Sequence, residues 1–310
     1  MRALVTGSEG FIGSHLTAAL RSNGHDVIGL DRRVGVGPGH RRLDLADPLT
    51  LSPLHKIVTA EIDVVFHLAA RPGVRDSHPA IDELRHRDNV LATRRLFEST
   101  PIDVPVVVTS SSSVYGGATV ANATIRPCRE GDPLRPVGGY ARSKAAMEEL
   151  CHQRRTRGGT VAVVRPFTVV GEGQRPDMAL SLWLAAVSSG RPIRILGSPE
   201  RTRDLTDIRG VIRGLTAVAD IGFNGTVNLG TGLGHRLIDV AHTLLETLGK
   251  PGEIVVAPAA AEERPATLAD TTLCTGLLGF TPTTDLGDVV ARIVEAGTGN
   301  VSVTTTRTAL

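Results

Sequence analysis

Short apolar runs alternate with helical patterns along the first half of the chain. The first run, Arg2 to Thr6, is followed by a glycine-rich turn and then by Leu16 and Leu20 at helical spacing. A longer helical pattern, with apolar positions three or four residues apart, covers 78–99. Further β-branched runs that predict strands lie at 27–30, 64–68, 104–109 and 161–164. Strands that alternate with helices predict an α/β fold built on a doubly wound parallel sheet.

The pattern changes after about Gly171. A helical segment at 180–187, a short strand at 193–196 and turn-rich stretches around Gly230 and Pro258 replace the regular alternation. We interpret this second part as a smaller C-terminal α/β lobe.

The patterns therefore predict two domains. The larger one covers residues 1–170, and part of the chain is expected to return to it near 200–230. The smaller lobe mainly takes residues 171–296. Residues 297–310 are rich in Thr, Val and Gly without an amphipathic period, which predicts a flexible tail.

Composition narrows the classes of partner. The 310 residues carry 34 basic and 32 acidic side chains, a formal charge of +2, and aromatic residues make up only 3%. Neither nucleic acid nor an anionic membrane is an expected partner. The three cysteines lack CxxC spacing, so no metal site is expected. No leader pattern and no apolar run of about 20 residues is evident, so we expect a cytoplasmic protein.

The glycine turn after the first strand has the spacing of a dinucleotide site. Gly7, Gly10 and Gly13 permit, in turn, a tight turn, the close approach of a pyrophosphate and close packing of the following helix. That helix begins near Phe11 and Ile12, where backbone N–H groups and a partial positive charge favour an anion. This segment is therefore a candidate pyrophosphate site.

Asp31 ends the second predicted strand, where a carboxylate accepts hydrogen bonds from ribose hydroxyls and repels a 2′-phosphate. The position favours NAD over NADP, although Arg32 and Arg33 follow directly. Asp44 is a candidate for the adenine amine, or a turn aspartate. We expect His67 to be a hydrogen-bonded residue at a strand end rather than a catalytic one. The other candidate cofactor-binding residues are Leu45, Leu68, Ala69, Ala70 and Asn89, of which Asn89 is either bonded to backbone near the site or exposed.

Four consecutive serines, 110–113, follow the fifth predicted strand at its carboxyl end, where open α/β sheets bind ligands. Later in the chain Tyr140 and Lys144 stand four apart on a predicted helix, which places both side chains on one face. A nearby cation favours the phenolate, so a group with a free pKa of about 10 becomes a candidate base. Such pairs are common on helix surfaces, but this order of strand, serine cluster and Tyr-x-x-x-Lys is specific.

Together with the glycine turn, this order resembles the extended short-chain dehydrogenase/reductase family, which includes the NAD-dependent nucleotide-sugar epimerases and dehydratases. The resemblance covers nearly the whole chain, including Glu130 and 228–232. It implies a Rossmann NAD-binding domain, a lobe that binds a UDP-sugar, and a homodimer formed through a helix bundle. It also implies that Ser111 binds the sugar 4-hydroxyl, that Tyr140 removes its proton, and that Lys144 holds the nicotinamide ribose.

The two residues after Ser111 bear on the reaction. By the same resemblance, members that eliminate water carry Asp and Glu there, and the decarboxylating uronate enzymes carry Glu second. In this chain the residues are Ser112 and Ser113, and a hydroxyl is not a general acid or base near pH 7 without an activating partner. This disfavours dehydration and decarboxylation and leaves 4-epimerisation, in which hydride leaves C4 for NAD⁺ and returns to the other face of the keto sugar.

The segment 165–178 is similar to that of UDP-glucuronate 4-epimerases, with Thr168 in place of an asparagine and Gln-Arg-Pro-Asp-Met following. The segment 71–75 resembles the same enzymes. The resemblance implies that Thr168 and the two serines fix the sugar carboxylate in the plane of the ring and oppose loss of CO₂. Arg75 is either a counter-ion for the carboxylate or a surface arginine, and Arg175 is a further candidate substrate-binding residue.

Some positions depart from the family pattern. Val170 stands where a tyrosine is usual, and Arg209 is followed by glycine where two acids are expected. Arg203 and Arg264 resemble the diphosphate-binding arginines, but the loop after Arg264 is shortened.

The leading hypothesis is a UDP-hexuronate 4-epimerase that converts UDP-glucuronate to UDP-galacturonate. The alternatives are a 4-epimerase of a neutral UDP-hexose, or another nucleotide-sugar dehydratase or decarboxylase. A non-catalytic NAD-binding regulator is a more distant alternative, because such proteins usually lack the Tyr-x-x-x-Lys pair.

Overall fold

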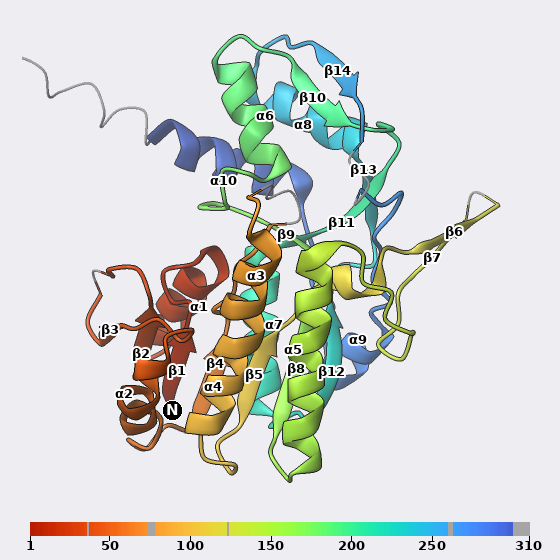
Figure 1. Cartoon of the computed structure of the whole chain (residues 1–310). Coiled ribbons are helices and arrows are strands. Elements are labelled where there is room, and N and C mark those ends of the chain that lie inside the picture. Colours follow the sequence, from red (N-terminus) through yellow and green to blue (C-terminus); the bar gives the residue numbers. More distant parts are fainter. Residues whose placement is uncertain (36, 74–77, 123, 260–262, 300–310) are drawn as a thin grey trace, which may run out of the picture.

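A seven-stranded parallel sheet forms the larger part of the molecule (Figure 1). The computed structural model describes residues 1–35, 37–73, 78–122, 124–259 and 263–299. The strand order is β12-β8-β5-β4-β1-β2-β3, which confirms the doubly wound α/β sheet. The strands are β1 (Arg2–Thr6), β2 (Asp26–Asp31), β3 (His40–Arg42), β4 (Val64–His67), β5 (Val106–Thr109), β8 (Val161–Pro166) and β12 (Gly225–Leu229).

Helices cover both faces of this sheet because each presents an apolar stripe to it. Leu16 of α1 and Val211 of α7 pack on one face, while Leu54 of α2, Leu96 of α4 and Met147 of α5 pack on the other. The helices around the sheet are α1 (Phe11–Ser22), α2 (Leu51–Val58), α3 (Ile81–Arg85), α4 (Ala92–Ser99), α5 (Gly138–Thr156), α7 (Ile208–Asp220) and α9 (Thr272–Leu278), with short 3₁₀ turns η1 (Pro48–Thr50) and η3 (Ser112–Tyr115).

The helical pattern predicted over 78–99 is interrupted in the structure. Between α3 and α4 the backbone forms a π-helical segment, η2 (His86–Leu91). Thr93 donates its hydroxyl to the carbonyl of Asn89 at 2.5 Å just after this segment. Such π-bulges often lie at functional sites, and this one carries the candidate residue Asn89.

The smaller lobe has its own core, formed by helices and a two-stranded sheet above the main sheet in Figure 1. Buried Trp183, Ile193, Leu244 and Val289 belong to it. Its elements are α6 (Ala179–Ser188), β10 (Ile193–Leu196), α8 (Leu237–Leu248), β14 (Ile254–Ala257) and α10 (Leu286–Gly299).

Two small sheets complete the structure. One joins the two parts and contains β9 (Thr168–Val170), β11 (Thr202–Asp207) and β13 (Gly234–Arg236); the other is a hairpin of β6 (Thr119–Ala121) and β7 (Thr124–Arg126). The chain re-enters the main sheet through α7 and β12, and the segment 297–310, expected as a tail, begins inside α10.

Two negative findings apply to the part of the chain that the structure describes. None of its helices is long and apolar enough to cross a bilayer. No group of three or more His, Cys, Asp or Glu side chains within the described ranges is arranged to hold a metal ion.

Candidate active site

The turn between β1 and α1 requires glycine for steric reasons. Gly7 has φ +71°, and a Cβ there would lie 2.7 Å from the backbone nitrogen of Ala69. At Gly13 a Cβ would lie 2.0 Å from the carbonyl oxygen of Gly7. The turn is therefore pressed against the chain that leaves β4, and α1 packs directly on the turn.

A cavity of about 500 Å³ opens over this turn. Gly10 is the N-cap of α1 and offers no side chain to the N–H groups of the first helical turn. Those N–H groups, on a wall that also contains Phe11 and Ile12, suit a pyrophosphate. The expected cofactor residues that line the cavity are Gly7, Gly10, Phe11, Ile12, Gly13, Asp31, Asp44, Leu45, Leu68, Ala69, Ala70, Tyr140 and Lys144.

Asp31 lies on the wall of this cavity at the end of β2. Its carboxylate accepts hydrogen bonds from the backbone nitrogens of Glu9 at 3.1 Å and Arg33 at 2.9 Å. Arg33 also brings its guanidinium to 3.4 Å, whereas Arg32 is paired with Asp88 at 3.0 Å. Backbone N–H groups therefore hold the Asp31 carboxylate in place, and the guanidinium of Arg32 pairs with Asp88 instead.

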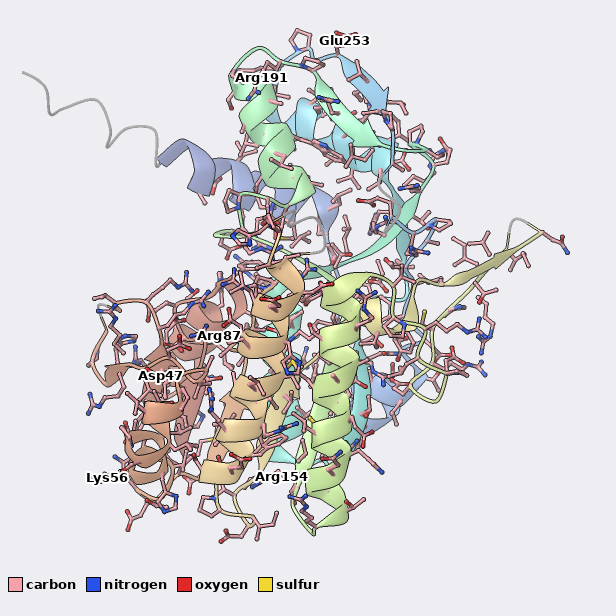
Figure 2. The ribbon with its side chains drawn as sticks, in the orientation of Figure 1. Asp47, Lys56, Arg87, Arg154, Arg191 and Glu253 are labelled. Carbon is pink, nitrogen blue, oxygen red and sulfur yellow. The ribbon has the colours of Figure 1, made fainter. Side chains whose placement is uncertain are left out.

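Asp44 is placed for either of its two expected roles, a turn aspartate or a partner of the adenine amine. Its carboxylate accepts from the Ala46 nitrogen at 2.9 Å, as a turn aspartate does, and it also lines the cavity. Arg87, labelled in Figure 2, reaches from η2 to the same carboxylate at 2.5 Å. Burial opposes ionisation of Asp44, but the hydrogen bonds from Ala46 and Arg87 outweigh it and lower the pKa.

Asn89 is buried and does not line either cavity. Its side-chain oxygen accepts from the Arg71 nitrogen at 2.6 Å, and its amide donates to the Ser143 hydroxyl at 2.8 Å. Of the two alternatives, the bond to nearby backbone is the one found. A direct contact of Asn89 with the cofactor stays a prediction.

His67 is confirmed as a hydrogen-bonded residue at a strand end. It is fully buried, and its ring nitrogens lie 2.8 Å from the Thr6 hydroxyl and 2.9 Å from the Thr93 hydroxyl. Burial, with a smaller contribution from the charge of Lys144, lowers the pKa of His67 to about 3. The ring is therefore neutral and positions β1 relative to α4.

Lys144 is buried on α5 and donates to the Thr109 carbonyl at 2.8 Å. Burial lowers its pKa to about 8, against the opposing effects of Cys151 and Glu148. One turn earlier, burial raises the pKa of Tyr140, opposed by a hydrogen bond with Ser111 and by the charges of two arginines. Desolvation therefore dominates at both side chains, and a lowering of the Tyr140 pKa by Lys144 stays a prediction.

A buried ion pair fixes α5 beside the serine cluster. Glu148 follows Lys144 by one helical turn and accepts from the Ser110 hydroxyl at 2.5 Å and from Arg165 at 2.5 and 2.9 Å. Arg165 also donates to the hydroxyl of Tyr115 at 2.8 Å. The candidate catalytic turn of α5 is thereby tied to the carboxyl ends of β5 and β8.

A second, larger cavity of about 980 Å³ extends from the serine cluster into the smaller lobe, where it reaches Arg191, labelled in Figure 2. The expected substrate residues that line it are Ser111, Ser112, Ser113, Thr168, Arg175, Arg203 and Arg264. Arg75 lies outside the described residues. Six residues line both cavities and mark the place where they meet: Ser111, Tyr140, Phe167, Thr168, Arg175 and Met178.

The charged walls of the larger cavity include carboxylates that sequence reasoning did not single out. Arg175 is bonded to Asp177 at 2.8 and 3.0 Å. Arg203 is paired with Glu263 at 3.1 Å, and Arg201 lies 3.5 Å from the same carboxylate. The acidic residue directly before Arg264 was the available signal for this pairing.

Two polar atoms on the wall of the larger cavity are buried without a hydrogen-bond partner in the described part of the chain. They are the hydroxyl oxygen of Ser113 and the side-chain oxygen of Gln174, whose amide nitrogen donates to Ser181 at 2.9 Å. Buried polar atoms are nearly always paired in native proteins, so these two suit contact with a polar ligand.

The sequence profile of the NAD dependent epimerase/dehydratase family matches residues 3–230. This chain belongs to that family. It is 32% identical over 308 residues to an uncharacterised UDP-glucose epimerase of Bacillus subtilis strain 168, covering 93% of this chain and 95% of the relative. It is 29% identical over 340 residues to a probable UDP-glucuronate 4-epimerase of Rhizobium meliloti strain 1021, covering 95% and 96%.

Solved structures agree with this membership. The UDP-glucuronic acid 4-epimerase from Bacillus cereus, in complex with UDP-glucuronic acid and NAD, superposes with a TM-score of 0.87 at 29% identity, covering 97% of this chain and all of that one. MoeE5 in complex with UDP-glucuronic acid and NAD gives 0.86 at 36% identity, with the same coverage. This chain is an NAD-dependent nucleotide-sugar epimerase, and the hypothesis of a non-catalytic regulator is set aside.

Proposed function

We propose that this enzyme interconverts UDP-glucuronate and UDP-galacturonate through a transient 4-keto sugar. The observation that carries the proposal is the junction of the two cavities, where Thr168 and Arg175 share a wall with Ser111 and Tyr140. A hydroxyl and a cation beside the reacting carbon suit a sugar that bears a carboxylate next to C4.

In this mechanism Tyr140 handles the proton of the sugar 4-hydroxyl. The Tyr140 oxygen takes that proton as the C4–H bond breaks and returns it when the bond re-forms. This requires the hydrogen bond from Ser111 and the charges of Arg175 and Arg85 to offset the burial that raises the pKa of Tyr140. Ser111, which is hydrogen-bonded to Tyr140, orients the hydroxyl. NAD⁺ held over the glycine turn would supply the acceptor for the C4 hydride and the donor for its return to the opposite face of the sugar, so the reaction would involve no net oxidation.

Lys144 has the position to hold the nicotinamide ribose, since it lines the cofactor cavity one turn from Tyr140. Its ammonium is anchored to Thr109, so the tip of the side chain is fixed rather than free to rotate. With a pKa near 8, it is largely protonated at neutral pH and offers a donor to ribose hydroxyls.

The uronate requires protection from decarboxylation, because a 4-keto uronate is a β-keto acid. Ser112, Ser113 and Thr168 offer hydroxyls on the wall of the sugar cavity, and the Ser113 oxygen has no other partner among the described residues. Hydrogen bonds from these hydroxyls would hold the carboxylate in the ring plane, where its C–C bond is poorly aligned with the carbonyl. The carboxylates on this wall, Asp177 and Glu263, are each paired with arginine.

A second candidate substrate is a neutral UDP-hexose such as UDP-glucose. The Bacillus subtilis relative is named a UDP-glucose epimerase, and MoeE5 has also been solved with UDP-glucose and NAD. In addition, Arg175 already has a carboxylate partner in Asp177, so its charge is not reserved for a substrate.

A panel of UDP-sugars followed by NMR tests the proposal. With UDP-glucuronate we expect UDP-galacturonate signals to grow to equilibrium, without release of CO₂. Faster turnover of UDP-glucose than of the uronate would favour the second candidate. A Tyr140→Phe sample identifies any activity that comes from contaminating enzymes.

The expected homodimer and cytoplasmic location are part of the same proposal. The face of α4 and α5 that would form a helix bundle exposes mostly polar residues, including Arg94, Glu98, Arg142, Glu149 and Gln153. A dimer through this face would be polar, so its dissociation should depend on salt concentration. Sedimentation velocity at low and high ionic strength measures both the mass and this dependence, and a monomer at low salt would refute the dimer.

A further inference from the structure

The segment that leaves β9 brings side chains into the junction of the two cavities. It begins at Gly171 and carries Gln174 and Arg175 to the cavity wall. Gly171 has φ +156°, and a Cβ there would lie 2.4 Å from Cγ2 of Ile208. The segment is thus pressed against the first residue of α7, but this contact alone does not fix its direction.

Arg292 supplies a second anchor for this segment. It lies on α10, beyond the residues matched by the family profile, and only 11% of its side chain is exposed. One of its terminal nitrogens bonds to Glu172 and the other to Asp207, while its Nε lies 3.0 Å from Asp288. A single guanidinium therefore connects the segment after β9, the end of β11 and the C-terminal helix.

Glu172 also faces the cofactor side of the molecule. Its carboxylate lies 3.9 Å from Nε2 of His15 on α1. The other ring nitrogen of His15 lies 2.9 Å from the carbonyl oxygen of Phe11, in the first turn of that helix. The residues next to Arg175 are consequently held between α10 and the helix that follows the glycine turn.

We propose that Arg292 is a positioning residue for the active site, which holds Glu172 so that Arg175 lies at the junction of the two cavities. The inference rests on the epimerase function proposed above. Arg292 lines neither cavity, so in the described structure it acts through the segment 171–175 and not by touching a ligand. Its loss should leave the glycine turn intact and displace Arg175.

A double-mutant cycle tests this coupling. The enzymes are the wild type, Arg292→Met, Arg175→Met and the double variant, with kcat and KM measured on whichever of UDP-glucuronate and UDP-glucose the wild type epimerises. We expect Arg292→Met to lower kcat/KM by about 10- to 100-fold, because small displacements of positioning groups cost that much. In the Arg175→Met background the same change should cost less than about threefold, since the group being positioned is already gone.

Two further variants serve as controls for the double-mutant cycle. Arg209→Met is the matched control: Arg209 is exposed and lies 3.9 Å from Asp288, one of the carboxylates that Arg292 contacts, so its loss should leave kcat/KM unchanged. Glu172→Gln weakens the pairing of Arg292 with Glu172 without removing the buried guanidinium. We expect it to lower kcat/KM by less than Arg292→Met does. It replaces Arg292→Met in the cycle if that variant does not fold.

Equal losses from Arg292→Met with and without Arg175 would overturn the inference, because they would mean that the two residues act independently. The same would hold if Arg292→Met lost no activity. Failure of the proposed substrate is a separate result, since inactivity on UDP-glucuronate together with turnover of UDP-glucose leaves the cycle measurable.

Discussion

The two cavities of this enzyme are built in different ways. The cofactor cavity is lined largely by residues at or just after the ends of strands of the main sheet, with Gly7 and Gly13 allowing the close contacts. The sugar cavity is formed by side chains from distant segments, and its cations Arg175 and Arg203 are already paired with carboxylates. A site whose residues follow strand ends can be predicted from the local spacing of residues in the sequence. A site made from paired side chains depends on which distant residues the fold brings together.

This difference affects how each cavity recognises its ligand. The cavity over the glycine turn contains two carboxylates held by hydrogen bonds, Asp31 and Asp44, and structures with 29% or more identity to this chain were solved with NAD. In the larger cavity, a substrate diphosphate would have to compete with Glu263 for Arg203. The balance of charges in the larger cavity therefore affects how tightly a UDP-sugar would bind.

The largest effect on activity is expected where the two cavities meet. Replacing Tyr140 by Phe removes the proton acceptor, so kcat should fall by about 10³-fold or more. NAD binding, followed by fluorescence or calorimetry, should change little because the ring remains. A variant within tenfold of wild-type turnover would exclude Tyr140 from the proton transfer.

Thr168→Val tests recognition of the sugar carboxylate. Loss of a hydrogen bond to a carboxylate should reduce kcat/KM for UDP-glucuronate by about 10- to 100-fold. Turnover of UDP-glucose, if present, should be unaffected, because that sugar has no carboxylate. Equal losses on both sugars would show that Thr168 does not select for the uronate.

Lys144→Met tests how much a buried cation at the cofactor cavity lowers the stability of the fold. The shift of the Lys144 pKa from 10.5 to about 8 corresponds to about 3 kcal/mol, and loss of the bond to Thr109 would offset about 1 kcal/mol of it. The cofactor-free variant should therefore be more stable than the wild type at pH 7 by about 2 kcal/mol in urea unfolding.

The pH dependence of this difference has a defined sign. Below pH 8 the lysine is charged in both the folded and the unfolded wild type, so the burial cost is fully present. Between pH 8 and 10.5 the unfolded wild type binds more protons, so its stability rises with pH relative to the methionine variant. A constant difference across this range would mean that Lys144 does not titrate at a lowered pKa.

The smallest effect is expected at Glu263. Glu263→Gln should remove a carboxylate that competes with a diphosphate for Arg203 and lower the KM for the UDP-sugar by about two- to fivefold. Thermal unfolding is measured beside it, since removal of one partner from a poorly exposed ion pair destabilises the fold. A higher KM with unchanged stability would instead make Glu263 a ligand of the substrate.

The sequence predicted the local features well. The strands at Arg2–Thr6 and Ile193–Leu196 have the expected bounds, because short β-branched runs between turns leave little alternative. The predicted cofactor residues other than Asn89 line one cavity. Most of them lie in or shortly after strands of one parallel sheet, and Tyr140 and Lys144 reach the cavity from α5. The π-helical break before α4 was not predictable, because apolar spacing does not distinguish a helix with one bulge from a regular helix.

Long-range pairings were also beyond prediction from one sequence. Nothing near Arg292 indicates that it meets Glu172 and Asp207, which lie far away in the chain. The raised pKa of Tyr140 likewise follows from burial, which a spacing of four residues does not report. Such contacts require the arrangement of the elements in space.

Return of the same hydride to C4 of a uronate distinguishes the proposed epimerisation from the other reactions. The decisive experiment uses UDP-glucuronate that carries deuterium at C4, incubated with the wild-type enzyme in ordinary water and followed by NMR and mass spectrometry. We expect UDP-galacturonate that retains the deuterium at C4. Hydrogen from water at C4, release of CO₂, or no conversion of the uronate would contradict it.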